Sequence, residues 1–147
     1  MAKGVYIGVD GIAHKIKKGY VGIDTEIPIY ETSVNTVAIN ASNISNYFTV
    51  TNGSYYFVGS GTSFVTNNGG IASSTAQTTL TAKQDISNIT FSYRYSSEPN
   101  YDKFTLTVDG TTVENAVSGA TTIKTYTGSL ATGKSIVFKY VKDVSAD

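Results

Sequence analysis

Three segments in the second half of the chain alternate between apolar and polar residues with a period of two. Residues 89–95 place Ile, Phe, Tyr and Tyr on one face, and residues 104–108 and 135–141 follow the same rule. Successive side chains of a β-strand point to opposite faces of a sheet, so this period indicates strands with one buried face. We expect the three strands to share one core, formed by Ile89, Phe91, Tyr93, Phe104, Leu106, Val108, Ile136, Phe138 and Tyr140.

Further short β-like segments follow one another from residue 47, and turn residues separate them. We expect strands at residues 47–51, 55–59, 63–66, 73–81 and 122–126. Asn52-Gly53-Ser54 predicts a hairpin between the first two, and Asp109-Gly110 predicts a tight turn. No segment has a convincing amphipathic-helix pattern, and the 11 Tyr and 6 Phe favour strands. The predicted fold class is all-β, an antiparallel, jelly-roll-like β-sandwich.

The first 30 residues contain an internal repeat. The segment at residues 5–10 returns 14 residues later at residues 19–24. Asp10-Gly11 predicts a two-residue hairpin turn after the first copy, with residues 12–16 as the returning strand and the second copy as a third strand. We therefore divide the chain into a β-hairpin docking region at 1–30, a connector at 31–46 with a short strand near 36–39, and a β-sandwich at 47–147.

Charge and composition exclude several function classes. Eleven basic residues balance eleven acidic ones without a basic stripe, so we expect no nucleic-acid binding. The absence of cysteine excludes disulfides, thiol catalysis and thiolate metal sites. No apolar run approaches the roughly 20 residues of a membrane-spanning helix, and the N-terminus lacks the apolar core of a signal peptide. We expect synthesis in the cytoplasm and no membrane partner.

Acid–base chemistry needs a nucleophile–base pair or two opposed carboxylates, and the sequence offers neither. The only histidine, His14, lies in the predicted hairpin, where a surface or packing role is expected. Glu98, Asp102, Asp109 and Asp143 could supply oxygens to calcium, but they form no dense acidic loop. Asp109 suits a turn, and Asp102 with Glu98 suits a loop-stabilising pair. We expect no enzymatic activity, no cofactor and no metal site.

Tyrosines could form a platform for a carbohydrate, because a flat ring with a polar group stacks on a sugar face. Tyr55 and Tyr56 are candidates, whereas Tyr93 and Tyr95 share the face of Phe91 and are expected in the core. Tyr101, with its neighbour Asp102, is the better exposed candidate for contact with a cell-surface glycan.

Two resemblances suggest a setting. The repeat Tyr6-Ile7-Gly8-Val9-Asp10-Gly11 and Tyr20-Val21-Gly22-Ile23-Asp24 resembles short tandem repeats in phage and prophage virion proteins of Gram-positive bacteria. Residues 89–93, 96–98, 101–104, 108–110, 133–140 and 142–145 match, in order, jelly-roll modules of bacterial and phage surface proteins. The aromatic residue usual in such modules is absent near Thr121-Thr122-Ile123, and no closing strand follows Val141.

These resemblances imply a virion structural protein, a tail- or baseplate-associated or capsid-decorating subunit that docks by its N-terminal hairpins. The expected location is the virion, after synthesis in the bacterial host cytoplasm. The alternative is a host-receptor or carbohydrate-binding adhesion module. The expected assembly interface consists of Val5, Tyr6, Ile7, Val9, Tyr20, Val21 and Ile23.

Two incomplete ends indicate assembly. The hairpin region carries more apolar surface than it can hide, and a sandwich without its closing strand would expose an edge. We therefore expect a homo-oligomer or a complex with other virion proteins. Residues 31–46 of the same chain could fill the edge instead.

Overall fold

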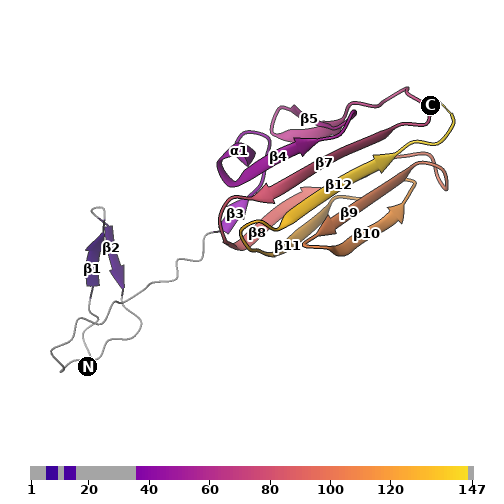
Figure 1. Ribbon diagram of the computed structural model, residues 1–147. Helices are drawn as coiled ribbons and strands as arrows, with labels where there is room; N and C mark the ends of the chain where they lie inside the picture. Colours follow the sequence, from indigo (N-terminus) through magenta and orange to yellow (C-terminus); the bar gives the residue numbers. More distant parts are fainter. Residues whose placement is uncertain (1–5, 10–11, 16–35, 146–147) are drawn as a thin grey trace. The chain divides into compact units, whose positions relative to one another are not determined.

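The computed structural model describes residues 6–9, 12–15 and 36–145, and Figure 1 shows their strands and one short helix. The chain divides into two compact units, Met1–Ser33 and Val34–Asp147. In the first unit, β1 (Tyr6–Val9) pairs antiparallel with β2 (Ile12–Lys15). Val9 lies opposite Ile12, so only residues 10 and 11 connect the strands, as the Asp-Gly pair predicts. The third strand predicted at 19–24 lies outside the described residues.

The second unit is a β-sandwich, as predicted. One sheet has five strands in the order β10 (Thr111–Val117), β9 (Lys103–Val108), β12 (Ser135–Val141), β7 (Thr75–Ala82) and β4 (Phe48–Asn52). The other has three, in the order β11 (Lys124–Leu130), β8 (Ile86–Tyr93) and β3 (Thr36–Ala38). From β7 onward the chain passes repeatedly between the two sheets, except that β9 and β10 form a hairpin within the five-stranded sheet. The pairing is antiparallel except between β3 and β8.

Two short elements lie beside the main sheets. The strands β5 (Phe57–Ser60) and β6 (Ser63–Thr66) form a separate hairpin, and α1 (Ile44–Tyr47) is a single helical turn. The sequence pattern indicates β6 but not α1, because one turn is too short to show a helical period. The segment predicted as a connector therefore contributes β3 and part of α1 to the sandwich, with Val37 and Ile44 buried in its core.

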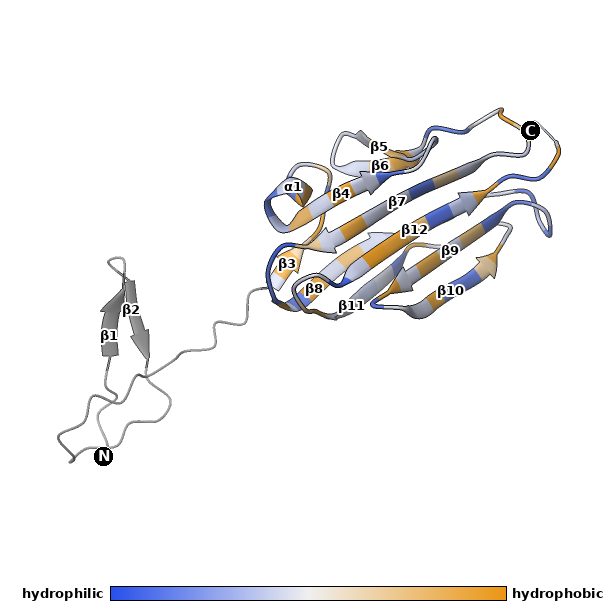
Figure 2. Cartoon of the chain, in the orientation of Figure 1, coloured by the Kyte–Doolittle hydropathy of each residue, from blue (hydrophilic) through white to orange (hydrophobic). Residues whose placement is uncertain are grey.

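All nine residues of the predicted core belong to one hydrophobic cluster. Ile89, Leu106 and Ile136 are fully buried, while Tyr93, Phe138 and Tyr140 are partly buried against the same cluster. Figure 2 shows the alternating apolar and polar bands along β9 and β12 that produce this core. The core also contains buried residues from outside the three alternating segments: Val37, Ile44, Phe48, Leu80, Ala82, Ile86 and Leu130.

The hairpin predicted around Asn52-Gly53-Ser54 is not formed. β4 pairs with β7, and β5 pairs with β6. After β4 the chain stays beside β7, because the Gly53 N–H donates to the Gln77 carbonyl and the Phe57 N–H donates to the Thr78 hydroxyl. β4 and β5 therefore each pair with another strand instead of with each other.

The expected open edge at the last strand is also wrong. β12 lies in the middle of the five-stranded sheet and pairs with β9 on one side and β7 on the other. The unpredicted strand β10 takes the edge beside β9. Its alternation is obscured because two register shifts interrupt its ladder and Ala116 has a φ of 48°. A further closing strand after β12 is therefore unnecessary.

Candidate ligand-binding groove

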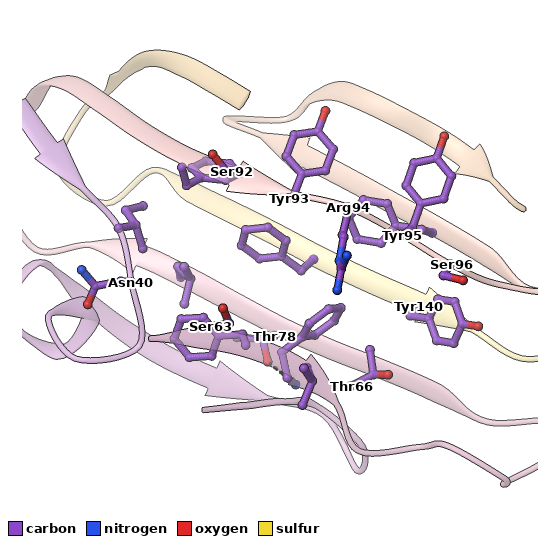
Figure 3. Close-up of a pocket in the computed structure, with 18 of the residues that line it drawn as sticks. Asn40, Ser63, Thr66, Thr78, Ser92, Tyr93, Arg94, Tyr95, Ser96 and Tyr140 are labelled. Carbon is purple, nitrogen blue, oxygen red and sulfur yellow. Dashed lines mark hydrogen bonds between the residues drawn. The ribbon is translucent and has the colours of Figure 1, made fainter. Parts of the chain in front are cut away.

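A gap in the three-stranded sheet opens a groove toward the interior of the sandwich. β3 pairs with β8 only from Asn88 to Thr90, and the Ile39 N–H makes the last bond of this ladder, to the Thr90 carbonyl at 2.9 Å. After Ile39 the chain leaves the sheet and continues to α1. The remaining part of β8, from Phe91 to Tyr93, therefore has no strand beside it on this side and borders a cavity of about 650 Å³. Residues of β6 line the same cavity, and Figure 3 shows the side chains around it.

The floor of the groove is apolar and tightly packed. It is formed by Leu80 of β7, Phe104 of β9 and Phe138 of β12, all on the inner face of the five-stranded sheet. Phe138 packs against Phe57 and Phe91, with ring centroids 5.8 Å and 5.5 Å apart. Aromatic rings at such distances hold one another in fixed orientations. The floor is therefore a preformed apolar surface, in which Leu80 and Phe104 are buried and the ring of Phe138 is half-buried.

Polar side chains surround this floor. Figure 3 shows Arg94 extending from the β8 side into the space bordered by Ser63, Thr66 and Thr78. Arg94 is the only arginine in the chain and is exposed. Among the described residues no carboxylate pairs with it. The described residues that line the groove include no Asp, Glu or His, so the guanidinium is a positive charge without a counterion in the groove.

Lys142, the other cation that lines the groove, belongs to a buried ion pair with Asp102. Their side chains are 3% and 4% exposed, and Lys142 Nζ lies 3.1 Å from Asp102 Oδ2. Tyr140 donates to the same oxygen, and the Asp143 N–H donates to the other at 3.0 Å. Burial alone would raise the pKa of Asp102, but these hydrogen bonds and the ammonium outweigh it and hold the pKa below its usual range. The charge of Lys142 is therefore neutralised internally.

A second network supports the rings behind the groove. Glu114 of β10 is buried and accepts hydrogen bonds from Tyr93 at 2.8 Å and Lys124 at 2.6 Å. Burial opposes the charge on Glu114, yet the two donors hold its pKa below the usual range. Burial, followed by the bond to Glu114, raises the pKa of Tyr93 to about 12. Lys124 also lies 5.6 Å from the centroid of the Tyr95 ring, within cation–π range.

The two residues predicted to contact a glycan, Tyr101 and Asp102, differ in their exposure to solvent. Tyr101 is 58% exposed, as expected of a surface ring. Asp102 is buried, and its oxygens are occupied by Tyr140, Lys142 and the Asp143 N–H, so it is not available at the surface. Its partners replace the predicted pairing with Glu98, which accepts a hydrogen bond from Ser145.

The other candidate acids stabilise local structure. Asp109 and Gly110 have φ values of 47° and 76°, and Val108 lies opposite Thr111, which defines the predicted tight turn. Asp143 accepts from the N–H and the hydroxyl of Ser145. In the part of the chain that the structure describes, no three His, Cys, Asp or Glu residues are grouped to hold a metal ion.

The remaining candidates take simple places in the fold. Tyr93 and Tyr95 pack against the core as predicted, and Tyr55 and Tyr56 are half-buried beside β7 and the β6 end. His14 lies in β2 opposite Ile7. The side chains of the predicted assembly residues, Val5, Tyr6, Ile7, Val9, Tyr20, Val21 and Ile23, lie outside the described part.

Comparison with protein-family models, with curated proteins and with solved structures gives no match for this chain. Among the described residues, no helix has the length and apolar character needed to cross a membrane. The groove therefore has to be interpreted from its own chemistry.

Proposed function

We propose that the chain is a structural subunit of a phage particle, tail- or baseplate-associated or capsid-decorating. Its N-terminal unit docks onto the particle, and its β-sandwich is displayed. One observation carries this proposal: among the described residues, the hydrophobic core of the sandwich consists of residues of the second unit, between Val37 and Tyr140. We infer that the N-terminal unit serves for attachment. The resemblance of its repeat to virion proteins of Gram-positive bacteria supplies the setting.

Strand pairing supports the docking role. Among the described strands, β1 and β2 pair only with each other. A two-stranded hairpin is marginally stable in water, and its outer edges offer unpaired N–H and C=O groups to a neighbouring strand. Docking through these edges would join the chain to other virion proteins or to a second copy. The assembly residues Tyr6, Ile7 and Val9 lie on β1.

The positions of the buried acids favour a non-catalytic protein. A general acid or base needs a carboxyl group that can reach a substrate. Asp102 is committed to Lys142, Tyr140 and a backbone N–H, and Glu114 is committed to Lys124 and Tyr93. The first network joins the start of β9 to the end of the neighbouring strand β12, and the second joins β10 of one sheet to β8 and β11 of the other.

Truncation tests the proposal. A chain without residues 1–30 keeps the whole second unit, and we expect it to fold into a β-rich, soluble protein that no longer enters particles. Tagged full-length and truncated chains would be expressed in the particle-producing bacterium, and gradient-purified particles would be probed for the tag. Incorporation of the truncated chain at the full-length level would contradict docking by the N-terminal unit.

A second candidate function is adhesion to a host receptor or carbohydrate. The groove favours it, since a preformed apolar floor with a few polar groups at its rim is typical of small-ligand sites. The two functions are compatible, because a displayed sandwich can also bind a ligand.

A further inference from the structure

We propose that the groove binds a saccharide that carries a carboxylate, with Arg94 as the residue that pairs with this group. The inference rests on the proposed function, since it names the ligand class of the displayed sandwich. The volume of the groove, about 650 Å³, falls within the range of small-molecule sites in proteins.

The charge of the groove selects an anionic ligand. Within the part of the chain that the structure describes, Arg94 has no carboxylate partner and no Asp or Glu lines the groove to compete for it. A guanidinium can donate two parallel hydrogen bonds to one carboxylate, the strongest pairing that this side chain makes. Lys142 does not compete for the ligand, because Asp102 already neutralises it.

The polar groups of the rim suit sugar hydroxyls. Ser63 and Thr66 supply hydroxyls that can both donate and accept. Asn40 Oδ1 already accepts from the N–H groups of Ser42 and Asn43, which leaves its amide nitrogen to donate to a ligand. Beneath these groups, the rings of Phe57 and Phe138 present an apolar surface on which the C–H face of a pyranose can pack.

An extended acidic peptide fits the groove less well. Peptides commonly bind such grooves by adding a strand to a free sheet edge. Thr90 is already paired with Ile39, and β8 ends at Tyr93. The residues of β8 beyond Thr90 are Phe91, Ser92 and Tyr93. The backbone N–H and C=O groups of successive strand residues point to opposite sides, so those of Phe91 and Tyr93 point toward β11 and only those of Ser92 point toward the groove. One residue is too short an edge for a stable ladder, since natural strands have three or more residues.

The test is a binding titration of the full chain, followed by NMR of backbone amides. The probes are galacturonic acid trisaccharide, its methyl ester, which is the same sugar without the negative charge, and an acetylated triglutamate peptide. We expect the acid to bind at least about tenfold more tightly than the ester, as the loss of a charge-assisted hydrogen bond implies. The largest shift changes should fall on Ser63, Thr66, Ser92 and Arg94.

Matched variants locate the charge that matters. Arg94→Gln should remove the preference for the acid over the ester. Lys139→Gln removes one positive charge from the outer face of β12 and should leave that preference unchanged, because Lys139 is exposed and does not line the groove. Both variants should keep the parent melting temperature, since both side chains are exposed.

Four results would overturn the inference: equal affinity for acid and ester, an unchanged preference in Arg94→Gln, tighter binding of triglutamate than of the saccharide, or no binding of the acid at millimolar concentration. Particle incorporation of the Arg94→Gln chain separates this inference from the proposed function. We expect normal incorporation, because Arg94 belongs to the groove and not to the docking unit.

Discussion

Replacing Asp102 by Asn should destabilise the sandwich strongly. The substitution keeps the shape of the side chain but removes the charge that Lys142 faces at 3.1 Å. Both side chains are almost fully buried, at 4% and 3% exposure, so the ammonium would remain in the interior without a counterion. Removing one partner of a buried ion pair typically costs about 3–5 kcal/mol. This loss is large against the roughly 5–15 kcal/mol by which a domain is stable.

The magnitude is measurable by urea and thermal unfolding followed by circular dichroism. For a domain of this size, about 1 kcal/mol corresponds to roughly 4 °C, so the melting temperature should fall by roughly 12–20 °C. Adding Lys142→Met should restore much of the loss, because an apolar replacement removes the stranded charge.

Asp109→Asn is the matched control, since it makes the same chemical change at an exposed ion pair. The side chains of Asp109 and Lys134 are 48% and 54% exposed, so the expected loss is below about 1 kcal/mol. An equal, small loss in Asp102→Asn and Asp109→Asn would refute the reasoning.

Three further predictions concern pH, a turn and a tyrosine. The pKa values of Asp102 and Glu114 are lower in the folded chain than their ordinary values of 3.8 and 4.5, so both carboxylates stabilise the fold above those values. The urea midpoint should therefore fall as the pH drops from about 5 to 2, and a flat midpoint would contradict the two networks. Gly110→Ala should cost about 1 kcal/mol, because Gly110 has a φ of 76°, whereas Gly69→Ala should be nearly neutral; equal losses in urea unfolding would argue against the turn. Burial and the bond to Glu114 raise the pKa of Tyr93 to about 12, so Tyr93→Phe should remove one phenol from the last step of the ultraviolet titration; loss of a phenol from the main step near pH 10 instead would contradict the buried, hydrogen-bonded position of Tyr93.

The sequence predicts the core well, because alternation reports burial directly. The same alternation also places both residues of the buried ion pair, Asp102 and Lys142, at inward-facing positions. Asp102 is in phase with Phe104, Leu106 and Val108, and Lys142 is in phase with Phe138 and Tyr140. Opposite charges at the ends of two inward-facing rows indicate a pair between adjacent strands. The prediction of a surface position for Asp102 beside Tyr101 is wrong because Asp102 follows this inward-facing period.

Turn chemistry was a less reliable guide. Asp109-Gly110 forms its predicted tight turn, whereas Asn52-Gly53 has similar chemistry and forms no hairpin. The difference is tertiary, because β4 pairs with β7 along the full length of β4, and the Gly53 N–H then donates to the Gln77 carbonyl of β7. A turn residue permits a hairpin, but the pairing partner of each strand depends on which pairing places its apolar side chains in the core.

The groove could not have been predicted from the residues alone. It exists because β3 covers only three residues of β8, a fact that depends on where the chain leaves the sheet. Arg94 follows an alternating strand and has no local pattern that marks it as a site. Only the three-dimensional arrangement places it beside hydroxyls of β6.

The most direct test of the account is a cryo-electron microscopy map of the purified phage particle at a resolution that traces backbones. We expect density for the N-terminal unit against a neighbouring virion protein, with a further strand paired to the edge of β1 or β2, and the sandwich on the outer surface with its groove open to solvent. A particle in which the sandwich makes the contact and the N-terminal unit makes none, or a particle without this chain, would contradict the central claim.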